Sequence, residues 1–171
     1  FRHFLSMIIN SVKISNQEQL DEYISRPTAE TAEVFRKLDG DIIFLGIAGK
    51  IGPSLARMAK RACDEAGVSK RIIGVSRFSN AEEKKQIESL GIETIQGDLL
   101  DNNFIAGLPE VKNVFFLAGM KFGSLENLSL TWAVNSFVPA MVAEHYKESR
   151  IVAFSTGCVY PLVPFVSGGS K

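Results

Sequence analysis

Between an apolar run and a helical pattern, the chain reads Gly46-Ile47-Ala48-Gly49-Lys50-Ile51-Gly52. The run before it, Ile42–Leu45, has the composition of a buried strand, and Pro53–Ala66 after it has the pattern of a helix that tolerates proline in its first turn. Glycines let the backbone bend tightly and approach a ligand, and the free N–H groups at a helix start attract a pyrophosphate. The stretch predicts a dinucleotide-binding turn. The alternative is a tight turn in which Gly52 only allows close helix packing.

Strand and helix patterns alternate from this turn onward. Strands are expected at Asp41–Leu45, Arg71–Val75, Glu93–Gln96, Asn113–Leu117 and Arg150–Phe154. Helices are expected at Gly52–Ala66, Asn80–Leu90, Asn102–Leu108 and Glu126–Glu148, the last kinked at Pro139. Strict alternation, with strands that are apolar throughout, predicts an α/β fold. We expect a Rossmann-like doubly wound parallel sheet with strand order 3-2-1-4-5 and its ligand between strands 1 and 4.

A short helical extension is predicted to precede the sheet. We expect residues 1–38 to form this extension and residues 39–171 to form the dinucleotide-binding domain. One helix is expected at Asn16–Ser25 behind Ser15 as N-cap, and a second at Thr28–Leu38 behind Thr28. The side chains expected on or near the apolar side of the second helix are Ala32, Val34, Phe35 and Leu38.

Composition and charge restrict the classes of partner. Of the 171 residues, 46% are hydrophobic and 22% are charged, as in globular domains, and nineteen basic residues balance nineteen acidic ones. No net field would therefore recruit nucleic acid, and the apolar stretches are too short to cross a membrane. Two cysteines and two histidines argue against a metal site and suit a reducing compartment. We expect a cytoplasmic protein with a small-molecule substrate, and leave open a homodimer.

The end of the second predicted strand bears on the cofactor. It reads Gly74-Val75-Ser76-Arg77, where the tip faces the adenosine ribose in nucleotide-binding sheets. A carboxylate at this place favours NAD, whereas Ser76 and Arg77 offer a hydroxyl and a guanidinium that suit a 2′-phosphate. Lys50 in the glycine turn adds a second cation. The pattern favours NADP, with NAD as the alternative if Arg77 is only a solvated residue.

Further segments follow the glycine turn in a fixed order. They are Gly97-Asp98-Leu99-Leu100-Asp101, Leu117-Ala118-Gly119, Asn135, and Phe154-Ser155-Thr156-Gly157-Cys158-Val159-Tyr160-Pro161. Together with the turn, they resemble the motifs of the extended short-chain dehydrogenases/reductases, the NAD-dependent epimerase/dehydratase family. The resemblance covers about residues 41–160, and five motifs in order are far more specific than any single one.

The resemblance implies a cofactor site at these segments. Asp98 would contact the adenine amino group, and Asn135 would order water and backbone near a catalytic lysine. Asp98 as a loop cap and Asn135 as an ordinary helix residue are the alternatives. Lys121 stands in a turn where the family more often has histidine; it would contact a ribose, a phosphate or a substrate carboxylate, or lie in solvent. The cofactor-binding residues so expected are Gly46, Ala48, Gly49, Lys50, Ile51, Gly52, Ser76, Arg77, Asp98, Leu99, Ala118, Gly119, Lys121 and Asn135.

For catalysis, the resemblance implies a hydroxyl that hydrogen-bonds the substrate oxygen. Aligned on Val159-Tyr160, Thr156 takes the catalytic Ser/Thr position, with Ser155 as second choice, and Tyr160 has a packing role. The family's catalytic Tyr-x-x-x-Lys, in which the lysine lowers the phenol pKa for proton transfer, occurs nowhere in the chain. We therefore expect that the chain lacks the substrate-binding lobe of a longer protein.

The function implied is an NAD(P)-dependent oxidoreductase or epimerase/dehydratase-like protein. Such proteins move a hydride between nicotinamide and an alcohol or ketone, often on a nucleotide sugar. One alternative is a nonenzymatic NAD(P)-binding sensor or scaffold that lacks the Tyr-Lys pair. A third interpretation is an unrelated α/β domain that binds a mononucleotide.

Overall fold

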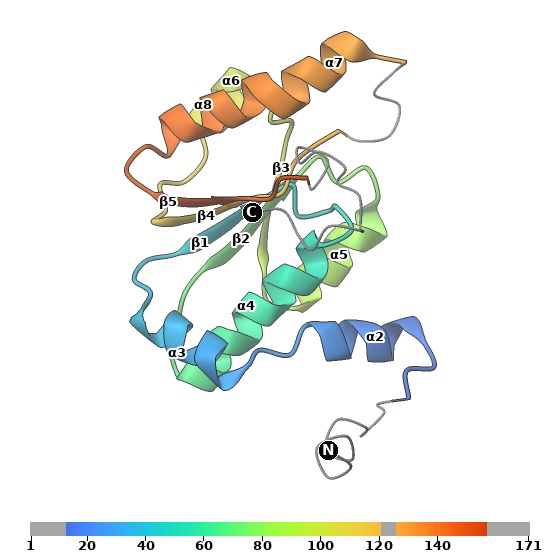
Figure 1. Ribbon diagram of the computed structural model, residues 1–171, viewed down its shortest axis with the longest axis vertical. Coiled ribbons are helices and arrows are strands. Elements are labelled where there is room, and N and C mark those ends of the chain that lie inside the picture. Colours follow the sequence, from blue (N-terminus) through green and yellow to red (C-terminus); the bar gives the residue numbers. More distant parts are fainter. Residues whose placement is uncertain (1–12, 121–125, 157–171) are drawn as a thin grey trace, which may run out of the picture.

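The computed structural model describes residues 13–120 and 126–156, which form a parallel sheet between two layers of helices (Figure 1). The strands are β1 (Ile42–Leu45), β2 (Ile72–Ser76), β3 (Glu93–Gln96), β4 (Asn113–Phe116) and β5 (Arg150–Ala153). The helices are α2 (Gln17–Ile24), α3 (Ala29–Lys37), α4 (Gly52–Ala66), α5 (Ala81–Ser89), α6 (Asn102–Ala106), α7 (Leu128–Trp132), η1 (Ala133–Phe137) and α8 (Val138–His145). Within these ranges, no helix combines the length and the apolar character that crossing a membrane requires.

The strand order of the sheet is β3-β2-β1-β4-β5, with every neighbouring pair parallel. This confirms the predicted Rossmann-like α/β fold and its order 3-2-1-4-5. The order reverses at β1, because β2 lies on one side of it and β4 on the other. In open parallel sheets of this kind, ligands bind at the carboxyl ends of the strands beside such a reversal.

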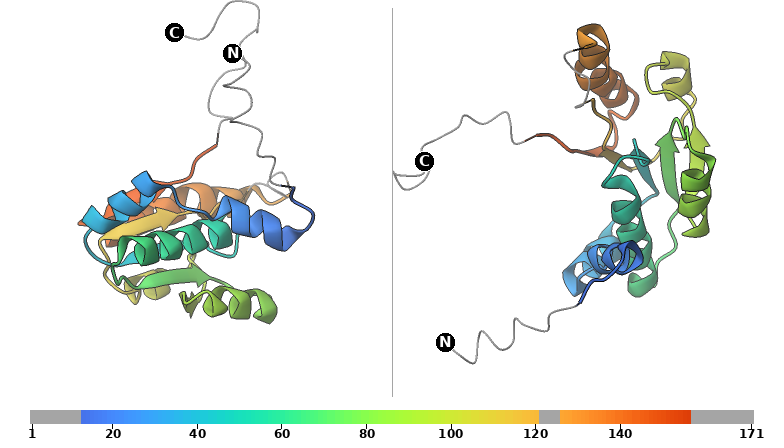
Figure 2. Two further views of the ribbon diagram at one scale, coloured as in Figure 1. Left: turned by 90° about the horizontal axis from the view of Figure 1, so that it is seen from below. Right: turned by 90° about the vertical axis from the view of Figure 1, so that its right-hand side faces the viewer.

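Alternate residues of the strands face two separate cores. Each core lies under one of the two layers of helices, which cover opposite faces of the sheet (Figure 2). In β1, Ile42 and Phe44 face α3, α4 and α5, whereas Ile43 and Leu45 face α6 and α8. All four are fully buried. Phe44 also stacks on Phe115 of β4, with ring centroids 4.8 Å apart. Burial on both faces explains why β1 reads as a continuous apolar run rather than an alternating one.

The two described helices before β1, α2 and α3, lie along α4. Glu22 of α2 accepts hydrogen bonds from Arg57 (2.9 Å) and Arg61 (3.0 Å), both on α4. Asn16 caps α2 by accepting from the Gln19 N–H, so the prediction of Ser15 as N-cap is wrong. The Ser15 N–H instead donates to the side chain of Gln19. The division of the chain at residue 38 stays a prediction.

Helix α3 has the predicted N-cap but a narrower apolar face than expected. The Thr31 N–H donates to the Thr28 hydroxyl at 3.2 Å. Ala32 and Phe35 are buried, whereas Val34 is 58% exposed, so its predicted place on the packed side is wrong. The reason is helical geometry: residues three apart share a face, and Val34 lies 100° from Phe35.

The single helix predicted for 126–148 contains one π turn in its middle. The N–H of Val138 donates to the carbonyl of Ala133, five residues back, and η1 joins α7 to α8. Pro139 follows at once; it has no N–H to donate, and its ring would clash with a carbonyl four residues back in an α-helix. The helix therefore widens just before Pro139. Its ribbon continues from α7 into α8 (Figure 1).

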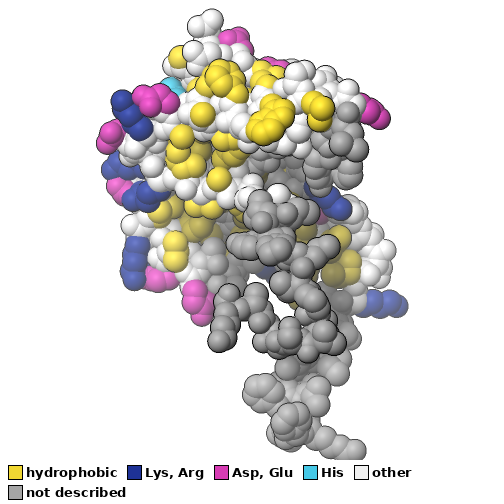
Figure 3. All heavy atoms as spheres, turned by 45° about the horizontal axis from the view of Figure 1, so that its top comes forward, with side chains coloured by type: hydrophobic (Ala, Val, Ile, Leu, Met, Phe, Trp, Pro, Cys, Tyr) yellow, Lys and Arg dark blue, Asp and Glu magenta, His cyan; other side chains and the backbone are white. Residues whose placement is uncertain are grey.

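The π turn also aligns an apolar stripe on the outer surface of this helix. Leu128, Trp132 and Phe137 are 60%, 70% and 57% exposed. Leu128 and Trp132 are one α-turn apart, and Trp132 and Phe137 are one π-turn apart. Hydrophobic side chains gather on this face in the space-filling view (Figure 3).

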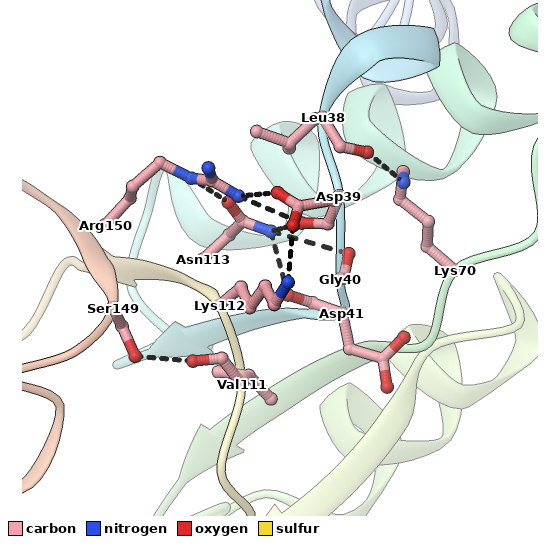
Figure 4. Close-up of polar contacts among 10 residues, drawn as sticks. All are labelled: Leu38, Asp39, Gly40, Asp41, Lys70, Val111, Lys112, Asn113, Ser149 and Arg150. Carbon is pink, nitrogen blue, oxygen red and sulfur yellow. Dashed lines mark hydrogen bonds and ion pairs between the residues drawn. The ribbon is translucent and has the colours of Figure 1, made fainter.

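At the amino ends of the strands, a polar cluster ties β1, β4 and β5 together (Figure 4). The buried Asn113 amide donates to the carbonyls of Asp39 (2.8 Å) and Asp41 (3.1 Å), and its oxygen accepts from Arg150 Nε (2.9 Å). Lys112 and Arg150 both pair with the Asp39 carboxylate. Hydrogen bonds from Lys112 and Arg150 hold the pKa of Asp39 well below its usual value. The cluster therefore fixes these three strands at their amino ends. Their carboxyl ends, where ligands bind in sheets of this kind, lie on the opposite side of the sheet.

Candidate functional site

The carboxyl ends of the strands open into one groove with two halves. Leu45, Phe116 and Ala153 are register partners, so the chain leaves β1, β4 and β5 at the same level. The half lined by residues 153–156, at the end of β5, is the β5 half and encloses about 670 Å³. The half lined by residues 76–79, at the end of β2, is the β2 half and encloses about 570 Å³. Both halves are lined by Gly46, Gly49, Leu117, Ala118, Gly119 and Met120. The groove therefore crosses the sheet where its strand order reverses, as predicted.

Gly46 allows the turn after β1 to lie against the turn after β4. Its φ is +92°, a conformation that other residues rarely adopt, and an added Cβ would stand 2.7 Å from the Ala118 nitrogen. The N–H groups of Gly46 and Ile47 both donate to the Val75 carbonyl, at 2.8 and 3.1 Å. The glycine turn is thus held by β2 on one side and touches the β4 turn on the other.

The rest of the glycine turn presents backbone N–H groups at the start of α4. The N–H groups of Gly49 and Gly52 close internal turns, whereas those of Lys50 and Ile51 have no hydrogen-bond partner among the described residues. A Cβ on Gly52 would stand 2.0 Å from the Ile47 carbonyl oxygen, so the helix start fits only glycine. Pro53 sits in the first turn, as predicted. This cradle of amides is the arrangement that a pyrophosphate requires.

The loop after β2 is held by two hydrogen bonds from the end of β3 and by the packing of Phe78. The Ser76 carbonyl accepts from the Gly97 N–H (3.0 Å), and the Arg77 carbonyl accepts from the Gln96 side chain (2.9 Å). Phe78 is 5% exposed, packs into the core beside α4, and has a φ of +44°. A bulky residue persists in that conformation only where its surroundings impose it. Ser76 and Arg77 are thereby placed in the β2 half of the groove.

The segment after β3 lines the same half. The Asp98 carboxylate accepts a hydrogen bond from the Leu100 N–H at 3.0 Å, and the backbone carbonyl of Asp98 accepts one from the Asp101 N–H. Asp101, not Asp98, caps α6, since the N–H groups of Asn103 and Phe104 donate to it. Leu99 is buried and faces the groove. The alternative of Asp98 as the helix cap is therefore wrong, and the residue lies exposed in the groove wall.

Asn135, in the π turn, holds the backbone of the loop after β4. Its side-chain oxygen accepts from the Met120 N–H and its amide donates to the Met120 carbonyl, both at 2.8 Å. Thr131, one turn earlier, donates from its hydroxyl to the Asn127 carbonyl at 2.8 Å, and this hydroxyl lies 3.6 Å from the Met120 sulfur. The floor shared by both halves of the groove is thus fixed by a helix on its outer side.

Ser155 and Thr156 follow β5 and line the β5 half, beside Pro139. They are the described residues of the segment predicted to be catalytic. Lys121 and Tyr160 lie outside the described residues. The predicted cofactor residues that line the groove are Gly46, Ala48, Gly49, Lys50, Ile51, Gly52, Ser76, Arg77, Asp98, Leu99, Ala118, Gly119 and Asn135. Their roles stay predictions.

Several groove residues were not predicted from the sequence. They are Phe78, Ser79, Glu83, Leu100, Leu130, Val134 and Val138. A signal existed for Glu83, which falls in the first turn of a helix that directly follows β2. None existed for Phe78, whose positive φ is set by packing. Within the described ranges, no group of three or more His, Cys, Asp or Glu side chains could hold a metal ion.

Comparison of the sequence with models of known protein families identifies the family of this chain. Residues 42–168 match the model of the NAD dependent epimerase/dehydratase family, which spans the sheet and both halves of the groove. The chain belongs to this family. The family is NAD dependent, so its cofactor class is a nicotinamide dinucleotide. The amide cradle between β1 and α4 fits such a group, because the N–H groups of Lys50 and Ile51 there have no hydrogen-bond partner among the described residues.

Two solved structures are similar to this chain over part of their length. One is Cj0485 dehydrogenase, with a TM-score of 0.50 and 16% identity over 64% of this chain and 46% of that one. The other is the alcohol dehydrogenase TADH from Thermus sp. ATN1, with a TM-score of 0.41 and 20% identity over 85% of this chain and 38% of that one. The chain therefore spans less than half the length of either dehydrogenase. No sequence among the curated proteins matches it.

Proposed function

We propose that the chain is the dinucleotide-binding part of an NAD(P)-dependent oxidoreductase or epimerase/dehydratase. A bound nicotinamide supplies hydride transfer to or from an alcohol or ketone carbon, here with a nucleotide sugar as the proposed substrate class. The observation that carries the proposal is the contact of Gly46 with Ala118. It brings the glycine turn and the β4 turn together at the reversal of strand order, with room for no side chain between them.

The pyrophosphate is assigned to the start of α4. The N–H groups of Lys50 and Ile51, which have no partner among the residues that the structure describes, would donate to its oxygens, and the Lys50 ammonium would add a charge. The first turn of α4 contains no acidic residue that would oppose an anion. The exposed Ile51 side chain lies in the β5 half and would cover the nicotinamide end of the cofactor.

The adenosine end is assigned to the β2 half. Arg77 has no ion pair among the described residues, so its guanidinium is available to a 2′-phosphate, and Ser76 adds a hydroxyl. Asp98 and Leu99 would contact the adenine. These features favour NADP, with NAD as the alternative.

The catalytic step is assigned to the β5 half. Thr156, with Ser155 as the second choice, would hydrogen-bond the substrate oxygen whose carbon exchanges the hydride. Asn135 would act through the Met120 backbone, and Lys121 would contact a ribose, a phosphate or a substrate carboxylate. Proton transfer requires a further acid–base group, which the family's Tyr-x-x-x-Lys supplies.

A second candidate is a nonenzymatic NAD(P)-binding sensor or scaffold. It is favoured by one observation, that the printed sequence contains no Tyr-x-x-x-Lys. Sequencing the encoding gene beyond Lys171 separates the two. A Tyr-x-x-x-Lys within a few tens of codons supports the enzyme, whereas a tyrosine with another residue at the lysine position supports the sensor.

Titration with NADPH and NADH tests the cofactor site. Arg77→Asp should weaken NADPH by about tenfold or more, the loss expected for a charge-assisted contact, and NADH by much less. Arg71→Ala is the matched control, because Arg71 lies at the other end of β2, where it pairs with Glu93. An equal effect of Arg77→Asp on both cofactors contradicts the 2′-phosphate assignment. Binding of neither cofactor to the wild type contradicts both candidate functions.

A further inference from the structure

The β2 half of the groove contains charges of both signs. Arg77 follows β2, Glu83 lies in α5, and Asp98 follows β3, and all three line this half. Among the described residues, this half therefore carries one cation and two carboxylates. This balance does not match a site built only for a 2′-phosphate, which itself carries about two negative charges.

Glu83 is the carboxylate that α5 leaves without a cation. Its neighbour Glu82 pairs with Lys85 at 3.1 Å, and Lys84 lies 4.0 Å from Glu88. Glu83 is partly buried, lines the groove, and has no ion pair among the described residues. The two lysines that follow it are thus engaged with other carboxylates, and its charge acts on whatever occupies the groove.

Helix capping does not account for Glu83. It is the third residue of α5 after the N-cap Asn80, where a glutamate often reaches back to the N–H of the cap residue. No such hydrogen bond is present between these two described residues. The Asn80 side chain accepts from the Glu82 N–H, and the Asn80 N–H does not donate to the Glu83 carboxylate. The helix dipole stabilises a carboxylate near a helix start only weakly.

We propose that Glu83 is a specificity-determining residue that opposes a 2′-phosphate at the adenosine end of the groove. This rests on the proposed function, because it requires that the groove binds NAD(P). Arg77 attracts the phosphate and Glu83 repels it, so the pair keeps the preference for NADP weak and leaves NAD able to bind. An unmodified ribose carries no charge and is insensitive to Glu83, or donates a hydroxyl hydrogen bond to it.

Glu83→Gln is the direct test, because glutamine keeps the size and the capping ability of glutamate but removes the charge. The full chain is titrated with NADPH and with NADH, in wild type and variant, by the change in nicotinamide fluorescence. We expect Glu83→Gln to tighten NADPH binding about tenfold, equivalent to about 1.4 kcal/mol, and to leave NADH within about twofold. Raising the salt concentration from 0.05 to about 0.5 M should shrink the difference, because the effect is electrostatic.

Glu82→Gln is the matched control. It removes the same charge from the adjacent position of the same helix turn, outside the groove, and should leave the NADPH to NADH ratio unchanged. An equal change in both cofactors for Glu83→Gln, no change in either, or the same shift with Glu82→Gln overturns the proposal while leaving NAD(P) binding intact. If the wild type binds neither cofactor, the proposed function fails as well, so the two failures are distinguishable.

Discussion

Asn135 holds Met120 by both polar groups of its backbone: the Met120 N–H donates to the Asn135 oxygen, and the Met120 carbonyl accepts from the Asn135 amide, each at 2.8 Å. The two residues come from the π turn and from the loop after β4. This cyclic pair fixes the groove floor without using a side chain of the loop itself.

Asn135→Ala should therefore loosen the β4 loop. Loss of the bond to the Met120 N–H is worth about 1 kcal/mol, and hydrogen exchange of that amide should accelerate about fivefold to tenfold. Asn135→Asp can still accept from Met120 but cannot donate to its carbonyl, and should have an intermediate effect. Ser136→Ala, the next residue of the π turn, is the control. Unchanged protection of the Met120 amide in Asn135→Ala would show that the pair does not hold the loop.

Gly46→Ala should destabilise the protein and prevent dinucleotide binding. The alanine would be strained at a φ of +92°, and its Cβ would also meet Ala118. Gly67→Ala separates these two causes, because Gly67 has a φ of +68° but nothing within 4 Å of an added Cβ. We expect a loss of about 1 kcal/mol in urea unfolding for Gly67→Ala, from strain alone, and a larger loss for Gly46→Ala. Normal dinucleotide binding by Gly46→Ala would contradict the close approach of the two turns.

The buried Asn113 should be a major contributor to stability. The two N–H donors of its amide are shared among the carbonyls of Asp39, Gly40 and Asp41, and its oxygen accepts from Arg150. Asn113→Ala would remove all of these hydrogen bonds from a buried position. We expect the free energy of unfolding to fall by about 2–3 kcal/mol, measured by urea denaturation. Asn102→Ala, an exposed position on α6, should change it by less than about 0.5 kcal/mol. Equal effects of the two substitutions would contradict the structural role of Asn113.

Asp39 should make stability fall in acid. Hydrogen bonds from Lys112 and Arg150 lower its pKa in the folded state, so the folded protein binds its proton less readily than the unfolded chain does. The contribution is present above the unfolded value of about 3.9 and is lost as the pH falls below it. The urea midpoint of the wild type should drop between pH 5 and pH 3 more than that of Asp39→Asn. Parallel pH profiles for the two proteins would rule out this contribution.

Local sequence signals predicted most of the fold. The bounds of α4 and β3 match the prediction, because α4 begins at a glycine followed by proline and ends at Gly67 in a left-handed C-cap, and polar residues bound β3. The strand order followed from alternation and short connections. The π turn was not predicted, because Pro139 signals a disturbance but not whether the helix kinks, ends or widens.

Tertiary packing decides the features of the groove that the sequence did not reveal. The positive φ of Phe78 comes from the insertion of its ring into the core beside α4, and no residue-type preference signals it. Glu83 lines the groove together with Arg77, Phe78 and Ser79 from the loop before α5. The pairing of Asn135 with Met120 depends on the register of the helix across the π turn. Motif matching identified Asn135 but not the partner of its side chain.

A crystal structure of this protein with a bound dinucleotide would show whether the dinucleotide lies across β1, where the strand order reverses. Crystals of the full chain with saturating NADP(H) should show the pyrophosphate about 3 Å from the Lys50 and Ile51 amides, with the adenosine ribose beside Arg77 and Glu83. Density for the dinucleotide at any other surface, or a groove that stays empty at saturation, would contradict the account.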